Sequence, residues 1–145
     1  TAAGEERTLP RDAIPFGYRA SGLPTGSVVT LATFALTPDD AAAMRRRISG
    51  YLVRRNASQP VEFRSAGSIF KNPPGEYAGR LVERAGLRGT RIGNAMISAK
   101  HGNYIVNLGG ARAADVLALV ALARRRVREA AGVELELEIK VVGED

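Results

Sequence analysis

The chain has no cysteine and no tryptophan, and its one histidine is His101. Without cysteine it can form no disulfide, no thiolate metal site and no cysteine nucleophile, and a single histidine does not indicate a zinc site. The longest apolar runs, such as Val116–Ala123, are far shorter than the roughly 20 residues of a membrane-spanning helix. We therefore expect metal-free chemistry and no membrane partner.

The first seven residues, Thr1–Arg7, are polar and acidic, whereas a secretory signal begins with basic residues followed by an apolar stretch. We therefore expect a cytoplasmic protein. The sequence has no initiator methionine and opens on a charged segment with prolines up to Pro15, which indicates a piece of a longer protein.

Hydrophobic residues make up 45% of the 145 residues and charged residues 25%, a composition typical of a folded domain. The net charge of +6 suggests an anionic partner, either a nucleic acid or a phosphorylated metabolite, or indicates no particular partner. Much of the positive charge lies in two clusters, Arg45–Arg47 with Arg54 and Arg55, and Arg124–Arg126 with Arg128. Both clusters fall in helical patterns, where such runs usually form a solvated helix face.

The spacing of apolar residues predicts strands that alternate with helices. Strands are expected at Ser27–Leu36, Val61–Phe70, around Tyr104–Val106 and at Val133–Val142, and helices at about Pro38–Asn56, Glu76–Ala85 and about Ala113–Ala131. The sequence has no Gly-x-Gly-x-x-Gly fingerprint and no Walker-type phosphate loop. We therefore predict an α+β fold, a mostly antiparallel sheet with helices packed on one side, rather than a doubly wound sheet.

Two of these elements make specific predictions about burial. The first helix places Ala41, Met44, Ile48 and Leu52 on one face, which we expect to be buried, with Met44 filling space in the core. In the last strand apolar residues alternate with polar ones, so one face is expected to be buried. Three glutamates share the other face, where solvent exposure is expected, and the alternation alone does not show which of them, if any, faces a cleft. They are Glu134, Glu136 and Glu138.

The densest group of polar side chains lies in Arg64–Gly75, which contains two serines, a lysine and an asparagine before Pro73-Pro74-Gly75. The prolines and the glycine end the strand and turn the backbone. The hydroxyl, ammonium and amide groups of such a loop could bind an oxygen-rich ligand. The alternative is an ordinary strand that ends in a turn.

Two further motifs are rich in groups that bind anions or sugars. In Phe16–Pro24, Tyr18 could lay its ring on a ligand and Arg19 could bind a carboxylate or phosphate, or both could cap a hairpin. Around the Tyr-Ile-Val strand lies a group that could contact a diphosphate or a sugar, although a lone histidine is usually a structural residue. This group is Ser98, Lys100, His101 and Asn103.

Six ordered motifs together resemble the UDP-N-acetylenolpyruvoylglucosamine reductase family. They are Phe16-Gly17-Tyr18-Arg19-x-Ser21, Gln59-Pro60, Ser65-Ala66-Gly67-Ser68-Ile69-Phe70-Lys71-Asn72-Pro73, Ala78-Gly79-x-Leu81, Ser98-x-Lys100-His101-x-Asn103-Tyr104-Ile105-Val106-Asn107 and Leu135-Glu136-x-Glu138. The resemblance implies a flavoenzyme in which NADPH reduces FAD and the flavin reduces UDP-N-acetylglucosamine enolpyruvate to UDP-N-acetylmuramate. It also implies a role in bacterial peptidoglycan synthesis, and so in cell shape and cell division.

The resemblance also implies roles for individual residues. Ser68 matches the family's serine general acid, and Glu138 matches the glutamate near the carbon that is protonated. Arg19 matches the arginine that steadies the substrate carboxylate and enolate. Three residues match positions that contact the substrate or support these groups, namely Tyr18, Lys71 and Asn72.

The family's flavin-holding half would precede Phe16 and is absent from the sequence. The resemblance therefore implies that residues 1–37 are the tail of the FAD-binding domain and residues 38–145 the substrate-binding domain. Alone, such a chain should hold no FAD and should not turn over, and the missing flavin-binding segment could be a separate piece.

A different class of function is a non-catalytic basic module that binds RNA or an acidic protein through the two arginine clusters. Aromatic residues make up only 6% of the chain, so nucleic-acid bases would find few rings on which to stack. The reductase interpretation is therefore favoured, and no nucleic acid is expected as a partner.

Overall fold

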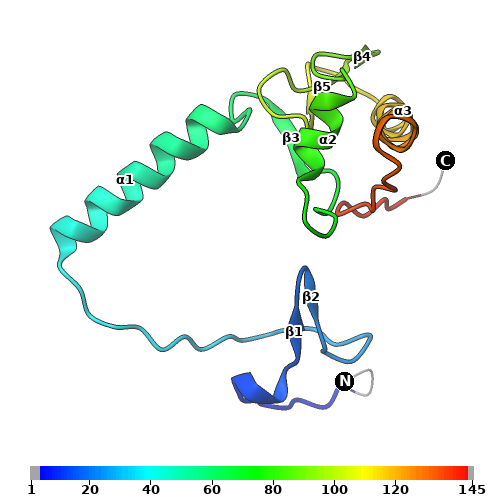
Figure 1. The fold of residues 1–145 in the computed structure, drawn as a ribbon. Helices are drawn as coiled ribbons and strands as arrows, with labels where there is room; N and C mark the ends of the chain where they lie inside the picture. The colour runs from blue at the N-terminus through cyan, green and yellow to red at the C-terminus, as the bar shows by residue number, and fades with distance from the viewer. Residues whose placement is uncertain (1–3, 144–145) are drawn as a thin grey trace. The chain divides into compact units, whose positions relative to one another are not determined.

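The computed structural model of the chain describes residues 4–143 and comprises two compact units, Thr1–Asp40 and Ala41–Asp145. Figure 1 shows the order of the elements along the chain. The first unit contains one antiparallel hairpin, and the second contains three helices and a four-stranded sheet.

The hairpin of the first unit carries the Tyr18–Arg19 motif at its turn. The unit's elements are the 3-10 helix η1 (Arg11–Ala13) and the strands β1 (Phe16–Gly17) and β2 (Ala20–Ser21). Arg19 has a φ of 54°, in the left-handed region that a tight turn uses at a cost for a non-glycine residue. The two residues therefore occupy the tip of a turn, as the hairpin alternative predicted.

The predicted strand at Ser27–Leu36 is wrong, because this segment has no regular structure and pairs with no strand in residues 4–143. Its apolar side chains are exposed, with Val28 at 81% and Leu36 at 88% of their accessible surface. A strand needs a neighbour for its backbone groups and a layer for its apolar face. The sequence pattern supplies the apolar residues but not these partners.

Helix α1 (Ala41–Ser58) begins three residues later than the predicted Pro38 and contains no buried residue. Met44, Ile48 and Leu52 remain 38%, 56% and 50% exposed, so the predictions of a buried face and of Met44 as core filler are wrong for the described residues. The helical spacing is real, but no other element within residues 41–143 covers the face. No helix in residues 4–143 has an apolar stretch that could cross a membrane.

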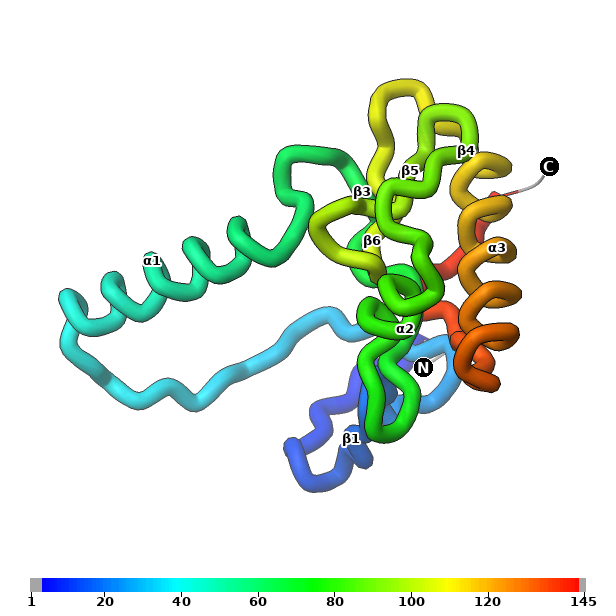
Figure 2. The backbone as a smooth tube through the Cα atoms, turned by 45° about the horizontal axis from the view of Figure 1, so that its top comes forward, coloured from blue at the N-terminus to red at the C-terminus, as the bar shows by residue number. Residues whose placement is uncertain are grey.

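The second unit confirms the α+β prediction. Its sheet has the order β3-β6-β5-β4, and every neighbouring pair is antiparallel. The strands are β3 (Arg64–Ser68), β4 (Arg91–Ile92), β5 (Ala95–Ile97) and β6 (Tyr104–Asn107). The helices α2 (Ala78–Arg84) and α3 (Ala113–Ala131) contact each other, and α3 also contacts β4 and β5 (Figure 2).

One apolar core joins α2, α3 and the sheet. The predicted spacing on α3 is confirmed, since Leu119 and Val127 are fully buried, and Gly132, with a φ of 66°, ends the helix. From α2, Val82 is fully buried, and from the sheet Ile97 is 1% exposed. These side chains fix the position of both helices on the sheet.

The predicted strand at Val133–Val142 is reduced to a single antiparallel bridge between Leu137 and Phe70. The predicted alternation nevertheless holds near its start, because Leu135 is fully buried and Glu134 and Glu136 are exposed. The segment therefore lies along Phe70 without forming a longer ladder.

Replacing Leu119 with alanine should destabilise the second unit by about 2–5 kcal/mol, because it removes fully buried methyl groups and leaves a cavity. Val53→Ala on the exposed surface of α1 is the control and should change the free energy of unfolding by about 0.5 kcal/mol or less. Urea unfolding followed by circular dichroism measures both. Equal effects of the two substitutions would contradict the described core.

Candidate active site

Ser68 lies at the end of β3, where the pairing with β6 becomes irregular. Ser65 pairs with Val106 and Ser68 with Tyr104, and the register shifts between these two pairs. Gly67 lies at this shift with a φ of 81°, a conformation that glycine adopts without a steric penalty. Such a bulge changes the direction in which the next side chain points, and Ser68 is half-buried.

Glu138 lies next to the Ser68 segment because two backbone hydrogen bonds join the chains on either side of the Phe70–Leu137 bridge. The N–H of Glu138 donates to the carbonyl of Ile69 at 2.8 Å, and the N–H of Lys71 donates to the carbonyl of Glu136 at 2.9 Å. Of the three glutamates on this segment, only Glu138 is half-buried. The structure thus brings the Ser68 and Glu138 segments side by side.

Lys71 and Asn72 follow directly and both have partners within the chain. The ammonium of Lys71 forms an ion pair with the carboxylate of Glu136. The Oδ1 atom of Asn72 accepts a hydrogen bond of 3.1 Å from the N–H of Ala78, the first residue of α2. Their side chains therefore fasten this loop to its surroundings, whether or not they also contact a ligand.

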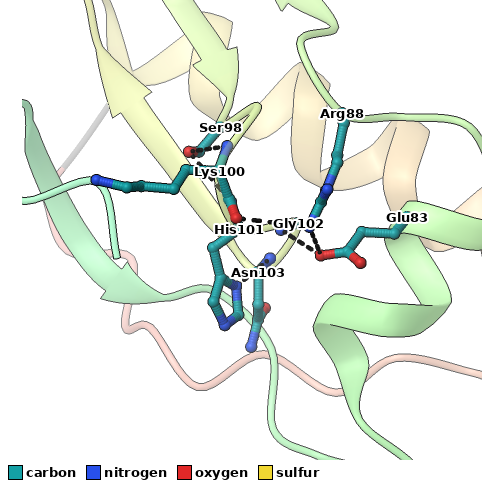
Figure 3. A network of polar contacts seen from close by, with 7 residues as sticks. All are labelled: Glu83, Arg88, Ser98, Lys100, His101, Gly102 and Asn103. Atoms are coloured by element: carbon teal, nitrogen blue, oxygen red, sulfur yellow. Dashed lines mark hydrogen bonds and ion pairs between the residues drawn. The ribbon is translucent and has the colours of Figure 1, made fainter. Parts of the chain in front are cut away.

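Ser98 and Lys100 occupy the turn between β5 and β6 (Figure 3). Ser98 is 3% exposed, and its hydroxyl oxygen accepts hydrogen bonds from the N–H groups of Lys100 and His101 at 3.1 and 3.4 Å. The ammonium of Lys100 donates to the carbonyl of Asn56 at 2.7 Å and lies 3.6 Å from the carboxylate of Glu62. Ser98 shapes the turn, and Lys100 connects it to the end of α1.

His101 and Asn103 complete the turn. The Nδ1 atom of His101 accepts a hydrogen bond of 3.1 Å from the N–H of Asn103, and its ring meets Tyr104 edge-on at 5.0 Å between centroids. Gly79 of α2 lies so close that a Cβ atom there would be 2.9 Å from Cε1 of His101. The side chain of Asn103 is buried and reaches the backbone of Phe70. Both residues hold neighbouring segments in place.

Glu83 on α2 holds the same turn from outside. Its Oε1 atom accepts a hydrogen bond of 3.3 Å from the N–H of Gly102 and one of 2.6 Å from Arg88 (Figure 3). Burial of the carboxyl acts to raise the pKa of Glu83. The hydrogen bonds from Arg88 and Gly102, with the charges of Arg88 and His101, outweigh it, and the net pKa is below the ordinary glutamate value.

Tyr18 and Arg19 belong to the first unit, whereas Ser68 and Glu138 belong to the second. Tyr18 is 60% exposed, and the guanidinium of Arg19 lies 5.8 Å from the centroid of its ring. The planar guanidinium is thus presented at an exposed turn, an arrangement suited to a carboxylate or phosphate.

The sequence interpretation missed the bulge at Gly67 and the support that Asn103 and Glu83 provide. An isolated glycine inside a strand pattern signals a bulge, so Gly67 could have been found from the sequence. No local pattern predicts that Asn103 reaches Phe70 or that Glu83 holds Gly102, because these partners meet only when the sheet and α2 assemble.

The arginines of α3 are largely paired. Arg124 and Arg128 contact the carboxylate of Glu134 at 2.8 and 3.8 Å, and Arg125 lies 4.0 Å from Glu129. These carboxylates offset part of the positive charge that the sequence places on this helix.

Comparison with known proteins gives consistent matches. A model of the C-terminal domain of UDP-N-acetylenolpyruvoylglucosamine reductase matches residues 59–142. The chain is 47% identical over 141 residues to the UDP-N-acetylenolpyruvoylglucosamine reductase of Moorella thermoacetica, covering 97% of this chain and 47% of that protein. It is 49% identical over 139 residues to UDP-N-acetylenolpyruvoylglucosamine reductase 2 of Symbiobacterium thermophilum, covering 95% of this chain and 45% of the relative.

The same likeness holds for the fold. The crystal structure of UDP-N-acetylenolpyruvylglucosamine reductase from Thermus caldophilus aligns with a TM-score of 0.73 and 49% identity, covering 88% of this chain and 46% of that one. The chain thus spans about half the length of the relatives that it matches.

Replacing Glu83 with glutamine should make stability less dependent on pH in acid. Because folding lowers the pKa of Glu83, its stabilising contribution is fully present above the ordinary glutamate pKa of about 4.3 and is lost as the pH falls through the lower folded value. The difference in urea midpoint between wild type and Glu83→Gln should therefore be larger at about pH 6 than at about pH 3.

The control for this measurement is Glu129→Gln on the exposed side of α3, where the nearest arginine is 4.0 Å away. Its midpoint should follow that of the wild type at both pH values. A Glu83→Gln difference that stays constant with pH would contradict the proposed contacts.

Proposed function

We propose, since the chain belongs to the UDP-N-acetylenolpyruvoylglucosamine reductase family through its C-terminal domain, that it supplies the substrate-binding and proton-donating part of such an enzyme. The reaction is the reduction of UDP-N-acetylglucosamine enolpyruvate to UDP-N-acetylmuramate in peptidoglycan synthesis. NADPH and FAD supply the hydride when they are bound to the complete protein. The expected location is the cytoplasm.

The observation that carries this proposal is the pairing of the Ser68 and Glu138 segments through the Phe70–Leu137 bridge. A reduced enolpyruvyl group must gain a proton at carbon, so a proton donor is needed near the reacting atom. A serine hydroxyl is a weak acid in water and can act only where a sheltered, charged surrounding favours transfer. The half-buried Ser68, on a segment hydrogen-bonded to that of Glu138, meets the first part of this requirement.

Arg19 is proposed to bind the substrate carboxylate and to offset negative charge as the enolate forms. Its planar guanidinium can donate two parallel hydrogen bonds to a carboxylate. Tyr18 beside it offers a ring and a hydroxyl at the same exposed turn. The two residues would act as one unit on the anionic end of the substrate.

Lys71 and Lys100 are proposed to bind the substrate diphosphate. Lys71 and Lys100 already lie against the carboxylates of Glu136 and Glu62. Both ion pairs are at least partly exposed, so each is worth little and can be exchanged for a phosphate at small cost. Four further residues are proposed to line or support the substrate site, namely Asn72, Ser98, His101 and Asn103.

Residues 4–40 do not fit a flavin site on their own. Within residues 4–40 only Ile14 and Leu23 are even half-buried, whereas a flavin ring needs enclosing apolar walls. We propose that a separate flavin-binding portion holds the FAD and that residues 1–37 continue it.

In the complete protein, Ser68→Ala should slow reoxidation of the reduced flavin by the enolpyruvyl substrate by roughly 10²-fold or more, as expected when a general acid is removed. Flavin reduction by NADPH should be unchanged. Stopped-flow absorbance separates the two half-reactions. Ser58→Ala, at the exposed end of α1, is the matched control. Full-rate substrate reduction by Ser68→Ala would remove Ser68 from the proposed role.

The 145-residue chain, purified alone, should show no visible flavin absorbance after incubation with FAD and desalting, because residues 4–40 provide no enclosing apolar walls for the ring. The complete protein, treated in the same way, is the control and should retain the flavin. Stoichiometric flavin on the 145-residue chain would refute a separate flavin-binding portion.

A further inference from the structure

We propose that Asn103 is a positioning residue, which sets the Ser68 hydroxyl relative to Glu138 by holding the backbone between them. The inference rests on the proposed function. It gives Asn103 a defined role that differs from substrate contact, the role that its sequence position suggested.

The ladder between β3 and β6 ends at Ser68, and Asn103 continues it with its own groups. The carbonyl of Asn103 accepts a hydrogen bond of 3.0 Å from the N–H of Ile69. Its side-chain Oδ1 accepts one of 2.9 Å from the N–H of Phe70, and its Nδ2 donates one of 2.8 Å to the carbonyl of Phe70. The side-chain amide thus replaces the peptide group of a neighbouring strand.

The 136–138 segment holds the opposite edge of the same backbone. Glu138 donates to the carbonyl of Ile69 at 2.8 Å, and the N–H of Lys71 donates to the carbonyl of Glu136 at 2.9 Å. Together with Asn103, these bonds satisfy the N–H and C=O groups of both Ile69 and Phe70. The backbone that follows Ser68 is therefore fixed on one side by Asn103 and on the other by Glu138.

Asparagine suits this place because its planar amide carries one acceptor and one donor in the arrangement of a peptide group. Asn103 is 4% exposed and Phe70 is 2% exposed, so removing the side chain leaves the N–H and C=O groups of Phe70 without their protein partners in a buried place. The Phe70 backbone would then have to move to find new partners. Ser68, two residues before Phe70, would move with it.

The hydrogen bonds that join Asn103 to Ile69 and Phe70, here called the Asn103 clamp, are supported by residues of α2 and of the turn before Asn103. The Nδ1 atom of His101 accepts a hydrogen bond of 3.1 Å from the N–H of Asn103. Gly79 of α2 lies close to the imidazole ring and limits the space in which it can move. Glu83 holds the intervening Gly102 (Figure 3). The position of the Asn103 backbone is thus fixed independently of any substrate, as a positioning role requires.

The test uses the complete flavin-loaded protein and the variant Asn103→Ala. The rate of flavin reoxidation by saturating UDP-N-acetylglucosamine enolpyruvate should fall by roughly 10- to 100-fold, since a displacement of about 1 Å can cost 10²-fold. The substrate dissociation constant and the rate of flavin reduction by NADPH should not change.

The matched control is Asn94→Ala, which removes an amide from the β4–β5 turn, where Oδ1 of Asn94 accepts a hydrogen bond of 2.6 Å from Arg91. It should react at the wild-type rate. Asn103→Ala that reacts like Asn94→Ala would overturn the inference. So would a raised substrate dissociation constant with an unchanged rate at saturation, because that result identifies a substrate contact.

If Asn103→Ala does not fold, Asn103→Asp takes its place, because it keeps the size of the side chain, and the ionised carboxylate cannot donate a hydrogen bond to the Phe70 carbonyl. The same loss of rate is expected.

Hydrogen exchange of the wild-type protein adds an independent test. A Phe70 amide that exchanges as fast as an exposed amide would refute the Asn103 clamp. A wild-type protein that does not reduce the substrate would refute the proposed function as well, whereas an active wild type with unaffected Asn103 variants would refute the clamp alone.

Discussion

The backbone of Ile69 and Phe70 is the constraint on which the candidate site depends. Both residues are almost fully buried, so their N–H and C=O groups must be satisfied inside the protein. No regular strand does this on either side. A side-chain amide from Asn103 and a short irregular segment at Glu136–Glu138 do it instead. Satisfying these groups brings Glu138 to the segment that carries Ser68, so a requirement of folding also assembles the candidate catalytic pair.

The bulge at Gly67 belongs to the same arrangement. A regular continuation of β3 would keep pairing with β6 and would point Ser68 as the strand pleat dictates. After the register shift Ser68 still pairs with Tyr104, and the next two residues bond to the backbone and the side chain of Asn103. Irregular backbone is costly in a buried place unless its polar groups are paired, and here Asn103 pairs them. The polar turn at Ser98–Asn103 therefore holds the backbone of Ile69 and Phe70 in place through Asn103, in addition to carrying charged side chains.

Many of the charged groups in the second unit lie in ion pairs. Lys71, Lys100 and three arginines of α3, Arg124, Arg125 and Arg128, each lie near a carboxylate. The arginine cluster of α1 is exposed in the same unit. Exposed pairs of this kind contribute little to stability, and they keep the cations available for exchange with an anionic ligand.

The sequence by itself determined the fold class, the apolar face of α3, the alternation near Leu135 and the motifs that resemble the reductase family, because these depend on local spacing and residue type. Only the tertiary structure decided which glutamate is sheltered, what Asn103 holds, and that Ser27–Leu36 and the apolar face of α1 stay exposed among the described residues. The physical reason is that burial and hydrogen bonding need a partner surface. A residue pattern predicts which face of an element is apolar, but whether another element covers that face depends on the assembled chain.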